Sequence, residues 1–170
     1  MTDALAELTA RARIHDAIVR NARGVDRLDR ALILSTFHPD AIDDHGAFKG
    51  SPEAFADWVI ARNAGVVHSS NHVLANQTIV LDGETARVET YFTSYQLFDR
   101  DGGQHRSISC GRYLDRFEAR DGDWRIADRL TVVDWRWSEA VAEAAPAAVA
   151  GLAVGVRDPS DPSYAFFTGA

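Results

Sequence analysis

Cysteine is almost absent from this 170-residue chain, in which Cys110 is the only one. An intrachain disulfide is therefore excluded, and a cysteine-rich metal cluster cannot form. Long apolar runs are also absent, so no stretch reaches the length needed to cross a bilayer. Positive charge is scarce relative to negative charge, with a formal net charge of −7 and a pI near 5.3. This balance argues against nucleic acid or an anionic membrane surface as a partner.

The remaining composition is that of a globular protein. Hydrophobic residues make up 46% of the chain and charged residues 25%, and 170 residues fit one domain with a sizeable core. The first residues, Met1 to Glu7, carry acids and lack the apolar core of a signal peptide. We therefore expect a cytoplasmic location.

The N-terminal third contains two successive helical patterns. The first spans about Asp3 to Ala22, with apolar residues at helical spacing and Gly24 as its stop. The second spans Val25 to Phe37 and has Asp26 in its first turn, where an acidic side chain suits the helix dipole. Pro39 ends this helix, because the residue before a proline disfavours the helical conformation.

A third helix and a meander of strands follow. A short strand is expected over residues 41–45, and Ser51-Pro52-Glu53 reads as the N-cap and first turn of the third helix. Beyond it, Asp82-Gly83, Asp101-Gly102-Gly103 and Asp121-Gly122 are hairpin signals. Four long antiparallel strands are therefore predicted, over 66–81, 85–98, 105–119 and 124–137. Three helices that cover one face of such a sheet define an α+β fold.

The first long strand carries polar side chains at its start. Because side chains alternate along a strand, His68, His72 and Asn76 are predicted to share one face. Burying imidazole and amide groups costs about 1–3 kcal/mol each unless they are partnered. One interpretation of this cost is a functional site. The other is that the histidines are ordinary core or surface residues with hydrogen-bond partners.

Several short motifs occur in a fixed order along the chain. They are Ile14-His15-Asp16 leading to Gly24-Val25-Asp26, then Phe37-His38-Pro39-Asp40-Ala41, Phe48-Lys49-Gly50, His72 with Asn76, and the stretch from Tyr113 to Ile126. From about residue 5 to 138, this order resembles the SnoaL-like group of the nuclear transport factor 2-like superfamily, which includes scytalone dehydratase and hexachlorocyclohexane dehydrochlorinase. The resemblance implies a cone-shaped α+β barrel, with three N-terminal helices on a strongly curved antiparallel sheet. Residues 1–138 would form this domain, and residues 139–170 a C-terminal tail.

The resemblance also implies a catalytic pair, Asp26 and His72, with Arg129 as a third catalytic residue. A neutral imidazole can take a proton from carbon, while a carboxylate on its other nitrogen fixes the tautomer. Arg129 would stabilise developing negative charge, and a surface ion pair with a neighbouring strand is its alternative role. The candidate substrate-binding residues, each of which could equally line or fill the interior, are His68, Asn76, Tyr91, Tyr113, Phe48 and Trp58.

These features predict a cofactor-independent lyase that acts on a small apolar, aromatic or cyclic molecule. Loss of water, loss of halide or a retro-aldol release of formaldehyde would suit the pair. The alternatives are a non-catalytic small-molecule binding protein, a polyketide cyclase or isomerase, and the small subunit of a ring-hydroxylating dioxygenase. No metal site is expected, because the histidines lack a third ligand at recognisable spacing.

The tail and the outer face of the sheet indicate self-association. Tyr164-Ala165-Phe166-Phe167 is unusually apolar for an exposed end, so it is predicted to close a pocket mouth, in its own subunit or a neighbour's. Disorder of the tail is the competing interpretation. The outer sheet face would carry apolar side chains that suit burial between copies. We expect a homo-oligomer, with a trimer favoured over a dimer.

Overall fold

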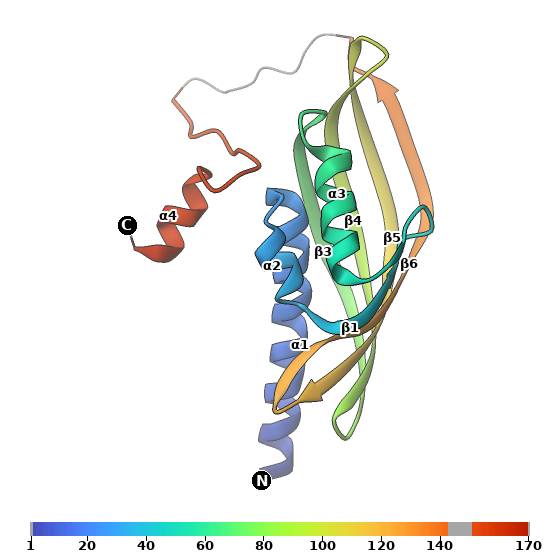
Figure 1. Ribbon diagram of the computed structural model, residues 1–170, viewed down its shortest axis with the longest axis vertical. Coiled ribbons are helices and arrows are strands. Elements are labelled where there is room, and N and C mark those ends of the chain that lie inside the picture. The colour runs from blue at the N-terminus through green and yellow to red at the C-terminus, as the bar shows by residue number, and fades with distance from the viewer. Residues whose placement is uncertain (1, 143–150, 170) are drawn as a thin grey trace.

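The computed structural model describes residues 2–142 and 151–169. Three helices come first, interleaved with two short strands, then four long strands and one short helix (Figure 1). The elements are α1 (Thr2–Arg27), α2 (Arg30–Leu34), β1 (Phe37–Asp44), β2 (Lys49–Gly50), α3 (Pro52–Asn63), β3 (Val67–Asp82), β4 (Thr85–Arg100), β5 (Gly103–Arg120), β6 (Asp123–Ala140) and α4 (Pro162–Thr168). No helix of the described residues is long and apolar enough to cross a membrane.

All six strands form one curved, unclosed sheet in the order β2-β1-β6-β5-β4-β3. The predicted meander of four long strands is confirmed, and each strand pairs antiparallel with the next. Its hairpins turn at Gly83, Gly102 and Gly122, whose φ angles of 59°, 77° and 77° are the positive values that such turns need. The sheet is not wholly antiparallel, because β1 pairs with β6 in parallel. These two strands are distant in sequence, so no tight turn imposes the opposite direction.

The two N-terminal helices end elsewhere than the sequence predicts. Gly24 does not stop α1, which continues to Arg27. A Cβ atom at Gly24 would lie 2.9 Å from Ile33, so glycine here lets α2 approach α1 closely. The chain turns instead at Leu28, whose φ is 54°, and Asp29 caps the short α2 through a hydrogen bond from Leu32 N. Asp26 therefore lies in the last turn of α1.

The core lies between the helices and the concave face of the sheet. α1 contributes Ile14 and Ile18, α3 contributes Phe55, and the sheet contributes Phe117 and Ile126, all of them essentially buried. Each helix has an apolar face that it can bury only against the sheet. The third helix begins as predicted, with the Ser51 hydroxyl accepting a hydrogen bond from Ala54 N.

The C-terminal segment packs on the corner between α1 and α2, where α4 lies apart from the sheet (Figure 1). The Tyr164 hydroxyl donates to Asp29 Oδ2 over 2.7 Å, and the Arg23 guanidinium lies 4.8 Å from the Tyr164 ring. Phe166 and Phe167 are 80% and 73% exposed. Closure of a pocket mouth by these residues, in their own subunit or a neighbour's, stays a prediction. Most of the alanine-rich stretch before this segment, residues 143–150, lies outside the described residues.

Candidate active site

Asp26 and His72 meet between the end of α1 and the start of β3. Their closest contact joins His72 Nδ1 to Asp26 Oδ1 over 2.7 Å. The His72 side chain is only 10% exposed and the Asp26 side chain only 13%. Because an ionised carboxylate can only accept, the shared proton belongs to Nδ1, which leaves the lone pair of Nε2 free. Within the described residues, Nε2 has no hydrogen-bond partner, so the pair presents a base held in one tautomer.

The position of Asp26 would be unfavourable without these partners. A carboxylate in the last turn of a helix faces the negative end of the helix dipole, not the positive end that the sequence predicts. Three hydrogen bonds offset this cost: Ser70 Oγ donates to Oδ1 over 2.8 Å, the His72 backbone N–H donates to Oδ2 over 2.9 Å, and His72 Nδ1 donates as described. Hydrogen bonds to the charged form stabilise a carboxylate. The start of β3 therefore supplies all three of these donors to the Asp26 carboxylate.

Two bulges in β3 decide which of its polar side chains face inward. The pairing with β4 shifts register between Val67 and Ser69 and again between Leu74 and Gln77. The predicted face shared by His68, His72 and Asn76 is therefore wrong, because a bulge reverses the alternation. Gln77 takes the inward place.

The two residues that the bulges displace lie away from the Asp26–His72 pair. Asn76 is exposed. His68 is about half exposed, and its Nε2 lies 2.9 Å from Asp99 Oδ1 on the neighbouring strand β4. Neither side chain is brought to the candidate site.

An aromatic wall continues from the His72 ring. The Phe92 ring lies 6.2 Å from it, centroid to centroid, and stacks on the Tyr113 ring at 4.5 Å. Burial raises the pKa of Tyr113 well above its ordinary value, so its hydroxyl stays protonated. That hydroxyl has no hydrogen-bond partner among the described residues and can donate to a ligand. Tyr91, the other predicted tyrosine, is 41% exposed on the opposite face of β4.

Arg129 faces inward, as a pocket role requires, but it is already bound. Its guanidinium makes a bidentate ion pair with Asp115 on β5, over 2.7 and 2.8 Å, and donates to Asn21 Oδ1 over 2.7 Å. Burial acts to lower the pKa of Arg129, but the Asp115 carboxylate outweighs it and raises that pKa. The guanidinium also lies 4.1 Å from the Tyr113 ring. Arg129 is thus placed to support Tyr113, and its ion pair is buried, not the surface pair of the alternative prediction.

A second histidine and aspartate pair, Asp43 and His45, was missed by the sequence reasoning. Asp43 is fully buried, its Oδ1 contacts His45 Nδ1, and its Oδ2 has no hydrogen-bond partner among the described residues. The His45 ring lies 6.4 Å from the Tyr113 ring, centroid to centroid, and its side chain is 21% exposed. The signal was present, because residues two apart in a strand share a face.

Phe48 and Trp58, two predicted wall residues, lie beside this second pair. Their rings are stacked 5.3 Å apart, and both pack against Phe55. The Phe55 ring in turn stacks on His45 at 4.6 Å. Phe48 and Trp58 therefore adjoin the Asp43–His45 pair through Phe55, and not the Asp26–His72 pair.

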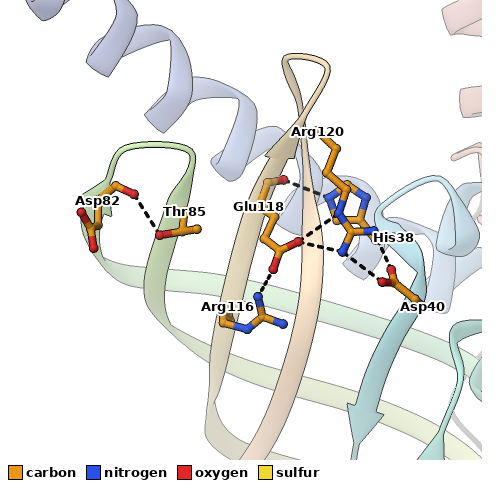
Figure 2. Close-up of polar contacts among 7 residues, drawn as sticks. All are labelled: His38, Asp40, Asp82, Thr85, Arg116, Glu118 and Arg120. Carbon is orange, nitrogen blue, oxygen red and sulfur yellow. Dashed lines mark hydrogen bonds and ion pairs between the residues drawn. The ribbon is translucent and has the colours of Figure 1, made fainter.

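A separate polar cluster lies near the β5–β6 hairpin (Figure 2). Arg120 bridges Asp40 and Glu118, and the buried His38 ring contacts the Glu118 carbonyl through Nε2 over 2.9 Å. The Arg120 guanidinium holds the pKa of Asp40 below its usual range. These charged side chains are largely exposed, so the cluster secures the start of β1 and offers no enclosed site. Among the described residues, no group of three or more His, Cys, Asp or Glu side chains is arranged to hold a metal ion.

Comparisons with known proteins agree with this architecture. The model of the SnoaL-like domain family matches residues 6–130, so the chain belongs to this family, within the nuclear transport factor 2-like superfamily. No protein with a curated description matches the chain.

Solved structures share the fold at low sequence identity. A hexachlorocyclohexane dehydrochlorinase of type 2 superposes with a TM-score of 0.77 at 19% identity, covering 86% of this chain and 99% of its own. A candidate scytalone dehydratase from Novosphingobium aromaticivorans gives a TM-score of 0.69 at 18% identity, covering 90% and 99%. The beta subunit of a candidate aromatic-ring-hydroxylating dioxygenase from the same organism gives 0.61 at 23%, covering 76% and 92%. At these identities the likeness shows the fold alone.

Proposed function

We propose that this chain is a cofactor-independent lyase that eliminates a small leaving group from an apolar cyclic or aromatic substrate. The observation that carries the proposal is the 2.7 Å contact between Asp26 Oδ1 and His72 Nδ1, which leaves Nε2 free to accept a proton. A base oriented in this way typically contributes about 10²–10⁴-fold to the rate of a proton transfer. Solved neighbours that are named as a dehydrochlorinase and a candidate dehydratase support the same class of reaction.

In the proposed reaction, His72 Nε2 takes a proton from carbon, and the electrons of that C–H bond form the new double bond as the leaving group departs. Asp26 stabilises the imidazolium that results. The Tyr113 hydroxyl, supported by the Arg129 guanidinium at its ring, donates to the developing anion. This assignment keeps the predicted roles of His72 and Asp26, gives Arg129 a supporting role in place of direct contact with the anion, and proposes Tyr113 as the tyrosine.

His45 is the proposed proton donor for a poor leaving group. A departing hydroxyl needs a proton, whereas a halide leaves without one. When a 1,3-diol fragments, His72 takes the O–H proton of its CH2OH group, the C–C bond breaks to release formaldehyde, and the electrons of that bond form the double bond that expels the other hydroxyl as water. Held by Asp43, the His45 ring can present Nε2–H if the pair carries one extra proton. Loss of water, alone or together with retro-aldol type release of formaldehyde from a 1,3-diol, therefore suits this site better than loss of halide.

The test is a substrate screen with mass detection of the product. Protein dialysed against a metal chelator is incubated with cyclic polychlorides, cyclic β-hydroxyketones and aromatic 1,3-diols. These would lose hydrogen chloride, water, and formaldehyde together with water, respectively. We expect a product from the β-hydroxyketone or the diol. Tight binding of such compounds without any product would support the non-catalytic binding protein instead.

A dioxygenase small subunit is the rival that a specific comparison favours, because one solved neighbour is such a beta subunit. In that case the chain should need a large subunit for solubility. Recombinant protein that is folded and active alone would exclude this role.

Self-association is proposed on separate grounds. The outer face of the sheet exposes large apolar side chains, and Phe166 and Phe167 on α4 expose a separate apolar pair on the helical side. The outer-face residues include Val73, Tyr91, Tyr95, Trp135 and Trp137. Contiguous apolar area of this kind marks interaction sites, so we propose a homo-oligomer, with a trimer favoured over a dimer. Light scattering of the purified chain measures the state directly.

A further inference from the structure

The C-terminal end of α1 is closed by a side chain from the far end of the sequence. A helix leaves its last four carbonyls without partners inside the helix. Arg157 supplies two of these partners: its Nε donates to the Asp26 carbonyl over 2.9 Å, and one terminal nitrogen donates to the Val25 carbonyl over 3.0 Å. The guanidinium is thus hydrogen-bonded to the backbone of Asp26 itself.

The same guanidinium also holds β3. Its other terminal nitrogen donates to the Val67 carbonyl over 3.2 Å. Val67 opens the strand that, a few residues later, provides Ser70 and His72, the side chains that hold the Asp26 carboxylate. One planar fork therefore joins the two elements whose spacing sets the contact between Asp26 and His72.

Arg157 is itself held in place by the segment that follows it. Asp161 accepts hydrogen bonds from Val156 N over 3.0 Å and from Ser163 N over 3.1 Å, and it lies 3.5 Å from Arg27 of α1. Burial lowers the pKa of Arg157 and the Asp26 carboxylate opposes this effect, so the two charges interact although no hydrogen bond joins them. The fork acts on Asp26 through its backbone and its charge.

We infer that Arg157 is a positioning residue and that residues 151–169 form a clamp which fixes Asp26 against His72. Without the clamp, the end of α1 and the start of β3 separate, and the imidazole loses its fixed tautomer. The kinetic consequence of this inference rests on the proposed function, whereas the geometric consequence does not. The clamp needs no contact between Arg157 and the substrate.

The test measures the histidine rings directly, without a substrate. Long-range ¹H–¹⁵N spectra report the tautomer and the Nδ1–H proton of each histidine. Arg157→Met keeps the aliphatic stem but removes every donor. Arg20→Met is the matched control, because Arg20 is an arginine of α1 whose hydrogen bonds among the described residues go to Asp16 and Ser35 and not to the Asp26–His72 pair. We expect Arg157→Met to weaken or abolish the protected Nδ1–H signal of His72, while the buried His38 is unchanged in both variants.

A folded Arg157→Met protein with the wild-type His72 spectrum would overturn the inference. If that variant does not fold, Arg157→Lys decides, since lysine keeps the charge but cannot reach three carbonyls in the fork geometry. An unaltered His72 spectrum in Arg157→Lys would then count against the clamp.

Kinetics separate this inference from the proposed function. Once a substrate is known, Arg157→Met should lower kcat by up to about 10²-fold with little change in KM, because small misplacements of a catalytic group can cost that much. An altered His72 spectrum in a protein that turns over nothing would support the clamp and contradict the lyase. Turnover that Arg157→Met leaves unaffected would support the lyase and contradict the clamp.

Discussion

Replacing Asp115 by Asn removes one buried charge and leaves its partner behind. Arg129 is 1% exposed and would keep its charge, because a guanidinium does not deprotonate in proteins. Of its charge-stabilising contacts, the hydrogen bond to Asn21 would remain. Breaking a buried ion pair from one side typically costs about 3–5 kcal/mol, because the remaining charge is desolvated without compensation. For a domain of this size, 1 kcal/mol corresponds to roughly 2–4 °C in Tm. Asp115→Asn should therefore lower Tm by about 6–20 °C.

The assay is urea and thermal unfolding of Asp115→Asn beside two further variants. Arg120→Met breaks the exposed ion pairs of Figure 2 and should cost less than about 1 kcal/mol. The double variant Asp115→Leu with Arg129→Met removes both charges and should recover most of the lost stability. An Asp115→Asn protein that loses less than about 1 kcal/mol in a cooperative transition would refute the reasoning.

Three further outcomes are expected. Gly111→Ala should cost about 1–3 kcal/mol in urea unfolding, since a Cβ atom there would lie 2.2 Å from the Val132 carbonyl oxygen; an unchanged midpoint would contradict the close approach. Hydrogen bonds from Ser163 lower the pKa of Asp161 to about 2 from its ordinary 3.8. Its contribution to stability is therefore complete above that ordinary value and disappears as the pH falls toward 2, so Asp161→Asn should flatten the loss of stability over this range. His45→Gln should slow elimination of water by roughly 10²-fold or more while elimination of halide from a matched substrate is little changed, and equal losses would contradict a proton donor.

The elements were predictable where local chemistry decides them. The Asp-Gly turns, the Ser51-Pro52 start of α3 and the long alternating strands all follow from residues close together in sequence. Asp26 and His72 were chosen through a family resemblance, and the structure places them in contact. Their roles remain predictions.

The remaining features depend on contacts between distant parts of the chain. Gly24 resembles a helix stop, but its lack of a side chain serves the packing of α2. The bulges of β3 exchange Asn76 for Gln77 on the inward face, and no single residue marks where a bulge occurs. Arg157 lies in a tail whose docking site is formed by residues 90 or more positions earlier.

The measurement that tests the central claim most directly is the initial rate of His72→Gln relative to wild type on the substrate found in the screen. His68→Gln is the matched control, because His68 lies on the same strand, pairs with Asp99 and is about half exposed. We expect His72→Gln to lose about 10²–10⁴-fold in rate and His68→Gln to retain wild-type turnover. A folded His72→Gln protein that turns over the substrate at the wild-type rate would show that the Asp26–His72 pair does not perform the chemistry.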